Sequence, residues 1–165
     1  MTDLGKALIA QAPDAIIFSD RAGVIRLWNH GAETLFGHSA EEAIGLTLDL
    51  IVPEPYRAAH WAGFFRAVQQ GRFANDDVLL TSRALTKDGR VVAVELSAAI
   101  IWSPSRRVTG ILAIGRDVTD RRAREQAQHE RISSLERQVA ALIEGANTGD
   151  GDSEPSGTGD QPRHG

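Results

Sequence analysis

Three consecutive β-rich stretches constrain the fold of this chain more than any other feature. They are rich in Val, Ile, Leu and Thr, which favour extended structure, and they read DVLLTSRALT (77–86), RVVAVELSAAIIW (90–102) and VTGILAIGRDV (108–118). The segments between them contain KDG and SPSR, which are turn-forming sequences. Short turns of this kind join neighbouring antiparallel strands. The sequence therefore predicts an antiparallel meander in the second half of the chain.

A hairpin near the N-terminus adds two strands. Residues 15–19 and 24–28 have the apolar content of strands, and Gly23 between them can adopt the positive φ of a tight turn. The preceding segment, residues 4–12, has apolar residues at near-helical spacing and stops before Pro13, so it predicts a short amphipathic helix. The pattern indicates an α+β chain with a five-stranded antiparallel sheet.

The helices between the hairpin and the meander carry their own start and stop signals. Asn29 can cap a short helix that ends at Gly37, and SAEE at 39–42 has the pattern of a capping box. A longer helix over 53–70 has prolines at its entrance and Gly71 at its exit. We expect these three helices to pack against the sheet.

The character of the sequence changes again at Asp120. Residues 120–144 contain no glycine or proline and mix charges of both signs. Four apolar residues at spacings of three, four and three predict the seam of a coiled coil over residues 120–145: Ile132, Leu135, Val139 and Leu142. We expect a parallel homodimer through this seam, aided by the N-terminal helix. Residues 146–165 are rich in Gly, Ser, Asp and Pro and predict a disordered tail.

Composition excludes several classes of function. The chain of 165 residues has no cysteine, which removes disulfides, thiolate nucleophiles, iron–sulfur clusters and cysteine-adduct photochemistry. A net charge of −4 gives no electrostatic reason to expect nucleic acid or an anionic membrane as a direct partner. No apolar run reaches the roughly 20 residues that span a bilayer. We expect a cytoplasmic protein.

The predicted order of strands and helices, together with three quoted stretches, resembles the PAS domain family. The stretches are PDAIIFSDRAGVIRLWNHGAETLFGHSAEEAIG (13–45), TKDGRVVAVELS (86–97) and GILAIGRDVTDRR (110–122). The resemblance implies a PAS sensory domain over residues 13–119, in which a five-stranded antiparallel sheet cups a ligand against short helices. It also implies that Asp117, Val118 and Thr119 match the family's link to an output helix.

The helix that begins PEPYRAAHWAGFFR (53–66) is similar to that of the haem-binding oxygen-sensor PAS domains. The resemblance implies that His60 is the iron ligand and therefore the metal-binding residue. It also implies that Arg66 meets a haem propionate, and we expect Arg57 to meet the propionates as well. On a helix His60 shares a face with Gly63 and Phe64, so that its imidazole would project beside a small residue that leaves room for a porphyrin edge.

The remaining pocket residues are expected from the strands. In the family's oxygen sensors a distal arginine or methionine lies about one strand length before the DG turn, whereas Val78, Leu79 and Leu80 occupy that region here. Together with Ile114 they predict an apolar distal wall without a side-chain donor for dioxygen. Carbon monoxide, nitric oxide or a redox change is then as plausible a signal as oxygen.

Two alternatives stay open. A single histidine on an apolar helix is often a packing residue, so the chain could be a haem-free dimerisation or interaction module, or a sensor of another small apolar ligand.

No carboxylate or histidine has a recognisable catalytic spacing, and we expect no enzyme activity. We expect no output domain after the PAS region, so that the signal would pass to a partner such as a kinase or transcription regulator.

Overall fold

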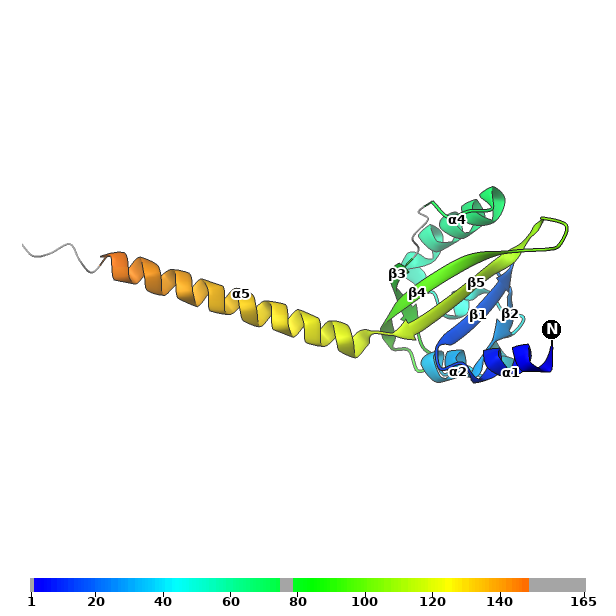
Figure 1. The fold of residues 1–165 in the computed structure, drawn as a ribbon, viewed down its shortest axis with the longest axis horizontal. Coiled ribbons are helices and arrows are strands. Elements are labelled where there is room, and N and C mark those ends of the chain that lie inside the picture. The colour runs from blue at the N-terminus through cyan, green and yellow to red at the C-terminus, as the bar shows by residue number, and fades with distance from the viewer. Residues whose placement is uncertain (1, 75–78, 149–165) are drawn as a thin grey trace, which may run out of the picture. The chain divides into compact units, whose positions relative to one another are not determined.

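The computed structural model describes residues 2–74 and 79–148 and divides the chain into two compact units, residues 1–122 and 123–165. The first unit contains a five-stranded sheet in the order β2-β1-β5-β4-β3 (Figure 1). Every neighbouring pair is antiparallel. The strands are β1 (Ala15–Asp20), β2 (Ile25–Trp28), β3 (Leu79–Leu85), β4 (Val91–Trp102) and β5 (Val108–Asp117). The predicted hairpin, meander and α+β class are confirmed.

Five α-helices and one 3₁₀ turn accompany this sheet. They are α1 (Asp3–Gln11), α2 (His30–Phe36), α3 (Ala40–Ala43), η1 (Leu48–Leu50), α4 (Glu54–Gln70) and α5 (Thr119–Thr148). The predicted capping signals are confirmed, since the Asn29 side chain caps α2 and Ser39 forms a capping box with Glu42 at α3. Helix α4 ends at Gly71 in the left-handed conformation. The turn η1 was not predicted from the sequence.

The hydrophobic core lies between one face of the sheet and the helices, and Figure 1 shows α4 across this side of the sheet. The largest fully buried side chains are Ile25, Phe36 and Val94, which come from a strand, a helix and a second strand. Helix α4 contributes the buried residues Phe64 and Ala67. Burial of these apolar side chains is the main stabilising term of the fold, and it leaves α4 facing the central strands.

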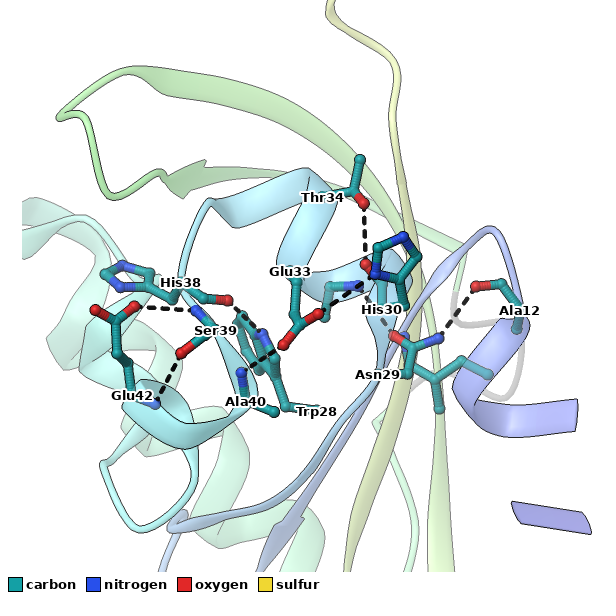
Figure 2. Close-up of polar contacts among 12 residues, drawn as sticks. Ala12, Trp28, Asn29, His30, Glu33, Thr34, His38, Ser39, Ala40 and Glu42 are labelled. Atoms are coloured by element: carbon teal, nitrogen blue, oxygen red, sulfur yellow. Dashed lines mark hydrogen bonds and ion pairs between the residues drawn. The ribbon is translucent and has the colours of Figure 1, made fainter. Parts of the chain in front are cut away.

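Asn29 connects the start of α2 to the N-terminal segment (Figure 2). Its side-chain oxygen accepts hydrogen bonds from the backbone N–H groups of Ile16 at 2.7 Å and Ala32 at 3.0 Å. Its amide nitrogen donates to the backbone carbonyls of Ile9, Ala12 and Asp14. Asn29 is 4% exposed, so all these backbone groups depend on one buried side chain.

Replacing Asn29 with alanine should lower the free energy of unfolding by about 2–4 kcal/mol. The substitution removes a helix cap, worth about 1 kcal/mol, and leaves buried backbone donors without an acceptor, at about 1–3 kcal/mol each. Chemical denaturation of the purified chain measures this change. Thr34→Ala is the control, because Thr34 donates an exposed hydrogen bond to the His30 carbonyl and should change stability by less than about 0.5 kcal/mol. Equal stability of the two variants would contradict this role.

Two hydrogen bonds and an ion pair connect the start of α5 to β4. The backbone N–H of Val118 donates to the Ala93 carbonyl at 2.9 Å, and the Ala93 N–H donates to the Thr119 hydroxyl at 3.0 Å. Arg121 and Glu95 form an ion pair at 2.6 Å. Val118 is buried. The predicted link to the output helix is therefore held by side chains and backbone of a strand that also lines the core.

The remainder of α5 belongs largely to the second unit, where it forms one continuous helix that ends at Thr148, beyond the predicted end at residue 145. The predicted seam residues are all more than half exposed in the single chain: Ile132, Leu135, Val139 and Leu142. Their spacing is the one on which the prediction of a coiled coil rests, and the coiled coil stays a prediction. The predicted tail, apart from its first residues, lies outside the described residues.

Candidate ligand-binding cavity

A cavity of about 430 Å³ lies between α4 and the inner face of the sheet. This size is within the range of roughly 300–1,000 Å³ of small-molecule sites. The sheet contributes mainly small or aliphatic side chains, including Ile17, Val94, Leu96, Ala98, Ile111 and Ala113. Helix α4 contributes Tyr56, Ala59, His60, Gly63, Phe64, Arg66 and Ala67. An apolar enclosure with a few polar groups suits a largely hydrophobic ligand.

Gly63 is an exposed residue of α4 that borders this cavity. A Cβ atom placed on it would meet no other atom within 4 Å, and the neighbouring positions on the same stripe of α4 are the small residue Ala59 and the lining residue Arg66. Glycine in a helix interior costs roughly 0.5–1 kcal/mol relative to alanine. The packing of this chain does not require the absence of a side chain at Gly63, whereas a ligand in the cavity would.

His60 presents a neutral imidazole to the cavity. Burial lowers the pKa of His60 from 6.5, and the charge of Asp49 opposes this shift only in part. The ring contacts Trp61 edge-on at a centroid distance of 5.1 Å and lies 6.1 Å from Phe64. A neutral imidazole is the form of histidine that binds metals, so His60 is in the correct protonation state at neutral pH.

The two ring nitrogens of His60 differ in their surroundings. Nδ1 is fully enclosed and has no hydrogen-bond partner in the described part of the chain. No described residue therefore orients the ring through this nitrogen. Nε2 is not enclosed in the same way. A buried nitrogen without a partner costs about 1–3 kcal/mol, which a purely structural role for His60 does not explain.

A polar cluster at the start of α4 holds Arg57 away from the cavity. Arg57 donates to the backbone carbonyls of Val52 at 3.0 Å and Asp49 at 3.1 Å, and its guanidinium lies 3.6 Å from the Asp49 carboxylate. Trp61 donates to the same carboxylate at 2.8 Å. The expectation that Arg57 lines the cavity beside Arg66 is corrected, because its donors are used to fix α4 to η1.

Two tryptophans pack on glycines that flank the cavity. The ring of Trp61 lies over Gly23, which has a φ of +78°, and the ring of Trp102 lies over Gly71, which has a φ of +66°. Each position requires glycine for two reasons. The backbone is left-handed there, and a Cβ atom would collide with an indole ring. These contacts connect the middle of α4 and its C-terminal end to the strands and the turn before β2.

The structure places the other predicted pocket residues as follows. Leu80 lines the cavity together with Gly63, Phe64 and Arg66. Val78 lies outside the described residues, as does the side chain of Leu79, the first residue of β3.

The expectation that Ile114 forms part of the distal wall of the cavity is corrected. It is 38% exposed and lies on the opposite face of the sheet from Ile111 and Ala113, because successive side chains of a strand alternate between faces.

Several lining residues were not anticipated. Ser19 and Ser82 could have been found from strand alternation, since they lie two positions after Ile17 and Leu80. Tyr56 lies one helical turn before His60 on the same face. Arg72 follows the helix-ending Gly71 and had no sequence signal for a position at the cavity.

The described residues contain no group of three or more His, Cys, Asp or Glu side chains that could hold a metal ion. Within the same residues, no helix is both long and apolar enough to cross a membrane.

The family profile described as PAS fold matches residues 3–118. The chain belongs to the PAS family. A solved PAS domain from Colwellia psychrerythraea is 30% identical and superposes with a TM-score of 0.61, covering 71% of this chain and 96% of that domain. The recognition of a PAS domain from sequence is confirmed.

Two curated relatives extend the comparison of the PAS domain. An uncharacterized protein of Azorhizobium caulinodans is 35% identical over 70% of this chain and 16% of its own length. The sensor protein FixL of Bradyrhizobium diazoefficiens is 29% identical over 79% of this chain and 25% of its own length. The chain thus spans a quarter or less of the length of these two relatives.

Proposed function

We propose that this PAS domain is a sensor that binds haem in the cavity through His60. The observation that carries the proposal is a half-buried imidazole whose enclosed Nδ1 has no partner among the described residues, beside open space at Gly63 on the same face of α4. Haem needs only one ligand from the protein, so the lack of a larger donor cluster in the described residues does not oppose the proposal. The similarity of the 53–66 helix to haem-binding PAS domains also supports it.

Each of the lining residues would make a different contact with the bound haem. His60 would donate a nitrogen to the iron, Gly63 would leave room for the ring edge, and Arg66 on the flank of α4 would meet the propionates. Phe64 and Leu80 would exclude water from the apolar walls. When bound, haem supplies an iron whose ligation or redox state can change with a diatomic gas or an electron donor.

Titration of the purified chain with haemin tests this function. We expect saturation at one haemin per chain, with a shifted Soret band and the spectrum of a histidine-ligated iron. A chain that takes up no haemin would contradict the proposal. The cavity would then favour a different small apolar ligand, and the exposed seam of α5 would favour a haem-free interaction module.

The route of the signal follows from the attachment of α5. Residues of β4 line the cavity, and Ala93 and Glu95 of the same strand hold the first turn of α5. A change in the cavity would shift β4, and the helix would pass that shift to a partner as a change of register or rotation. The partner would be a signalling protein such as a kinase or transcription regulator.

The proposed homodimer pairs two α5 helices through the seam. Replacing Leu135 and Val139 with Asp would bury charge between the helices and should shift the sedimentation mass from dimer to monomer. Ala140→Asp with Ala141→Asp is the matched control, since both positions lie off the seam and should leave the dimer intact. An unchanged mass in the seam variant would show that any dimer forms elsewhere.

A further inference from the structure

We infer that the hydroxyl of Ser19 determines which small molecule the cavity prefers, by donating a hydrogen bond to an acceptor atom on the sheet side. Ser19 lies in β1 and lines the cavity. It is 2% exposed, and its hydroxyl forms no hydrogen bond with any described residue. The inference rests on the proposed haem site and adds the residue that selects the molecule bound there.

The pairing of β1 with β5 places the Ser19 side chain on the inner face of the sheet. The register between these two strands is continuous, with Ser19 opposite Ile111. Side chains alternate along a strand and opposed residues share a face, and both Ile17 and Ile111 line the cavity. Among the enclosed side-chain atoms of the described residues, only His60 Nδ1 lacks a partner. The Ser19 oxygen is therefore not sealed in the packing but open to the cavity.

Burial without a partner distinguishes Ser19 from the other hydroxyl groups at the cavity. Tyr56 and Ser82 also line it, but both residues are exposed and can bond to water. Ser19 is paired with Ile25 on one side and Ile111 on the other, where an aliphatic residue would pack well. A buried hydroxyl without a partner costs free energy. Packing alone therefore does not explain a serine at this position.

Ser19 and His60 lie on opposite walls of the cavity. His60 comes from α4, and Ser19 comes from the sheet. The ring of Trp61, the neighbour of His60, lies over Gly23 in the turn that joins β1 to β2. The part of α4 that carries His60 is therefore close to the end of β1 that carries Ser19. A ligand held by His60 on one wall presents its other side to the sheet.

The chemistry of the serine hydroxyl defines the class of molecule that it favours. A hydroxyl donates one hydrogen bond to an acceptor atom and offers an apolar molecule nothing comparable. Donors in the pocket beside a haem decide which gases the iron binds. Dioxygen draws negative charge from ferrous iron and becomes a hydrogen-bond acceptor, whereas carbon monoxide remains a weak one. The sheet wall, which the sequence predicted to lack a side-chain donor, thus has one in Ser19.

Ser19→Ala tests this role in the ferrous, haem-loaded chain. We expect its affinity for dioxygen to fall about two- to tenfold, which corresponds to one hydrogen bond, while its affinity for carbon monoxide changes by less than about twofold. Equilibrium titration with each gas, followed by the Soret absorbance, measures both affinities. Ser19→Thr keeps a hydroxyl and should keep most of the preference. Ser97→Ala is the matched control, because Ser97 is an exposed serine of β4 that does not line the cavity.

Thermal unfolding of the haem-free chain gives a second readout that separates ligand binding from packing. Ser19→Ala removes a buried hydroxyl that has no partner in the described residues, so its melting temperature should equal or exceed that of the wild type. A lower melting temperature would show that the hydroxyl serves the fold, and it would overturn the inference.

The outcomes also separate this inference from the proposal of haem binding. If Ser19→Ala takes up haemin normally and keeps the wild-type ratio of the two gas affinities, the role of Ser19 is overturned and the haem site stands. If Ser19→Ala loses haemin uptake, Ser19 supports the site itself and does not select the gas, which overturns the inference as well. A wild-type chain that takes up no haemin would overturn both proposals.

Discussion

His60→Ala is expected to weaken haemin binding at least about 100-fold. Loss of a hydrogen bond to a metal-bound histidine alone costs about 10–100-fold in affinity, so that loss of the ligand itself should reach at least the upper end of that range. Equilibrium titration followed by the Soret absorbance measures the effect. His129→Ala on the exposed surface of α5 is the control and should bind as the wild type does.

The fold of the His60→Ala variant should survive the substitution. The change removes a buried nitrogen that has no partner in the described residues, and this gain offsets part of the packing that is lost. We expect the free energy of unfolding to change by no more than about 1 kcal/mol. A variant that binds haemin as tightly as the wild type would make His60 a packing residue.

Gly63→Leu is expected to abolish binding of any ligand that occupies the cavity while stabilising the protein. Leucine is a strong helix former, and replacing glycine in a helix interior gains roughly 0.5–1 kcal/mol. Its Cβ would meet no other atom within 4 Å, so the side chain can extend into the cavity without displacing the core. Haemin titration and thermal unfolding together measure the two opposite effects.

Two control variants distinguish the effect of a larger side chain from the effect of placing it at the cavity. Ala62→Leu adds the same kind of side chain at an exposed position of α4 that does not line the cavity, and should leave ligand binding unchanged. Gly63→Ala should give most of the gain in helix stability with a smaller loss of binding. If Gly63→Leu binds ligand normally, the open space at Gly63 is not part of the ligand site.

Local signals predicted most of the fold. Asn29, Ser39 and Gly71 mark helix ends through interactions with residues a few positions away, so their roles can be read from the sequence. The further bonds of Asn29 to Ile9 and Ile16 could not be predicted, because they depend on how α1 and β1 meet. Long-range contacts of this kind need the tertiary arrangement.

The sequence carries more information about the side of α4 that borders the cavity than about the strands. A helical face can be counted from His60, and Gly63 and Phe64 on that face line the cavity. In β5 the run ILAI is apolar throughout, so alternation does not reveal which residues face inward, and Ile114 was assigned to the wrong face. Its face is fixed only by pairing with Ile16 and Ser97.

Arg57 illustrates a different limit. Its charge and its place on the His60 helix suggested contact with a propionate, whereas the turn η1 brings the Asp49 carboxylate and carbonyl to its guanidinium. A short 3₁₀ turn has few sequence signals, so this competing partner was not foreseen. An ion pair within reach of the helix start then determined the direction of the side chain.

The coordination of iron by His60 is tested most directly by resonance Raman spectroscopy of the ferrous, haem-loaded chain. The account predicts an iron–imidazole stretching band that shifts when the histidines carry nitrogen-15. The band should be absent from His60→Ala and should return, without the isotope shift, when free unlabelled imidazole is added. A wild-type spectrum without an iron–imidazole band, or the same isotope-sensitive band in His60→Ala, would contradict ligation by His60.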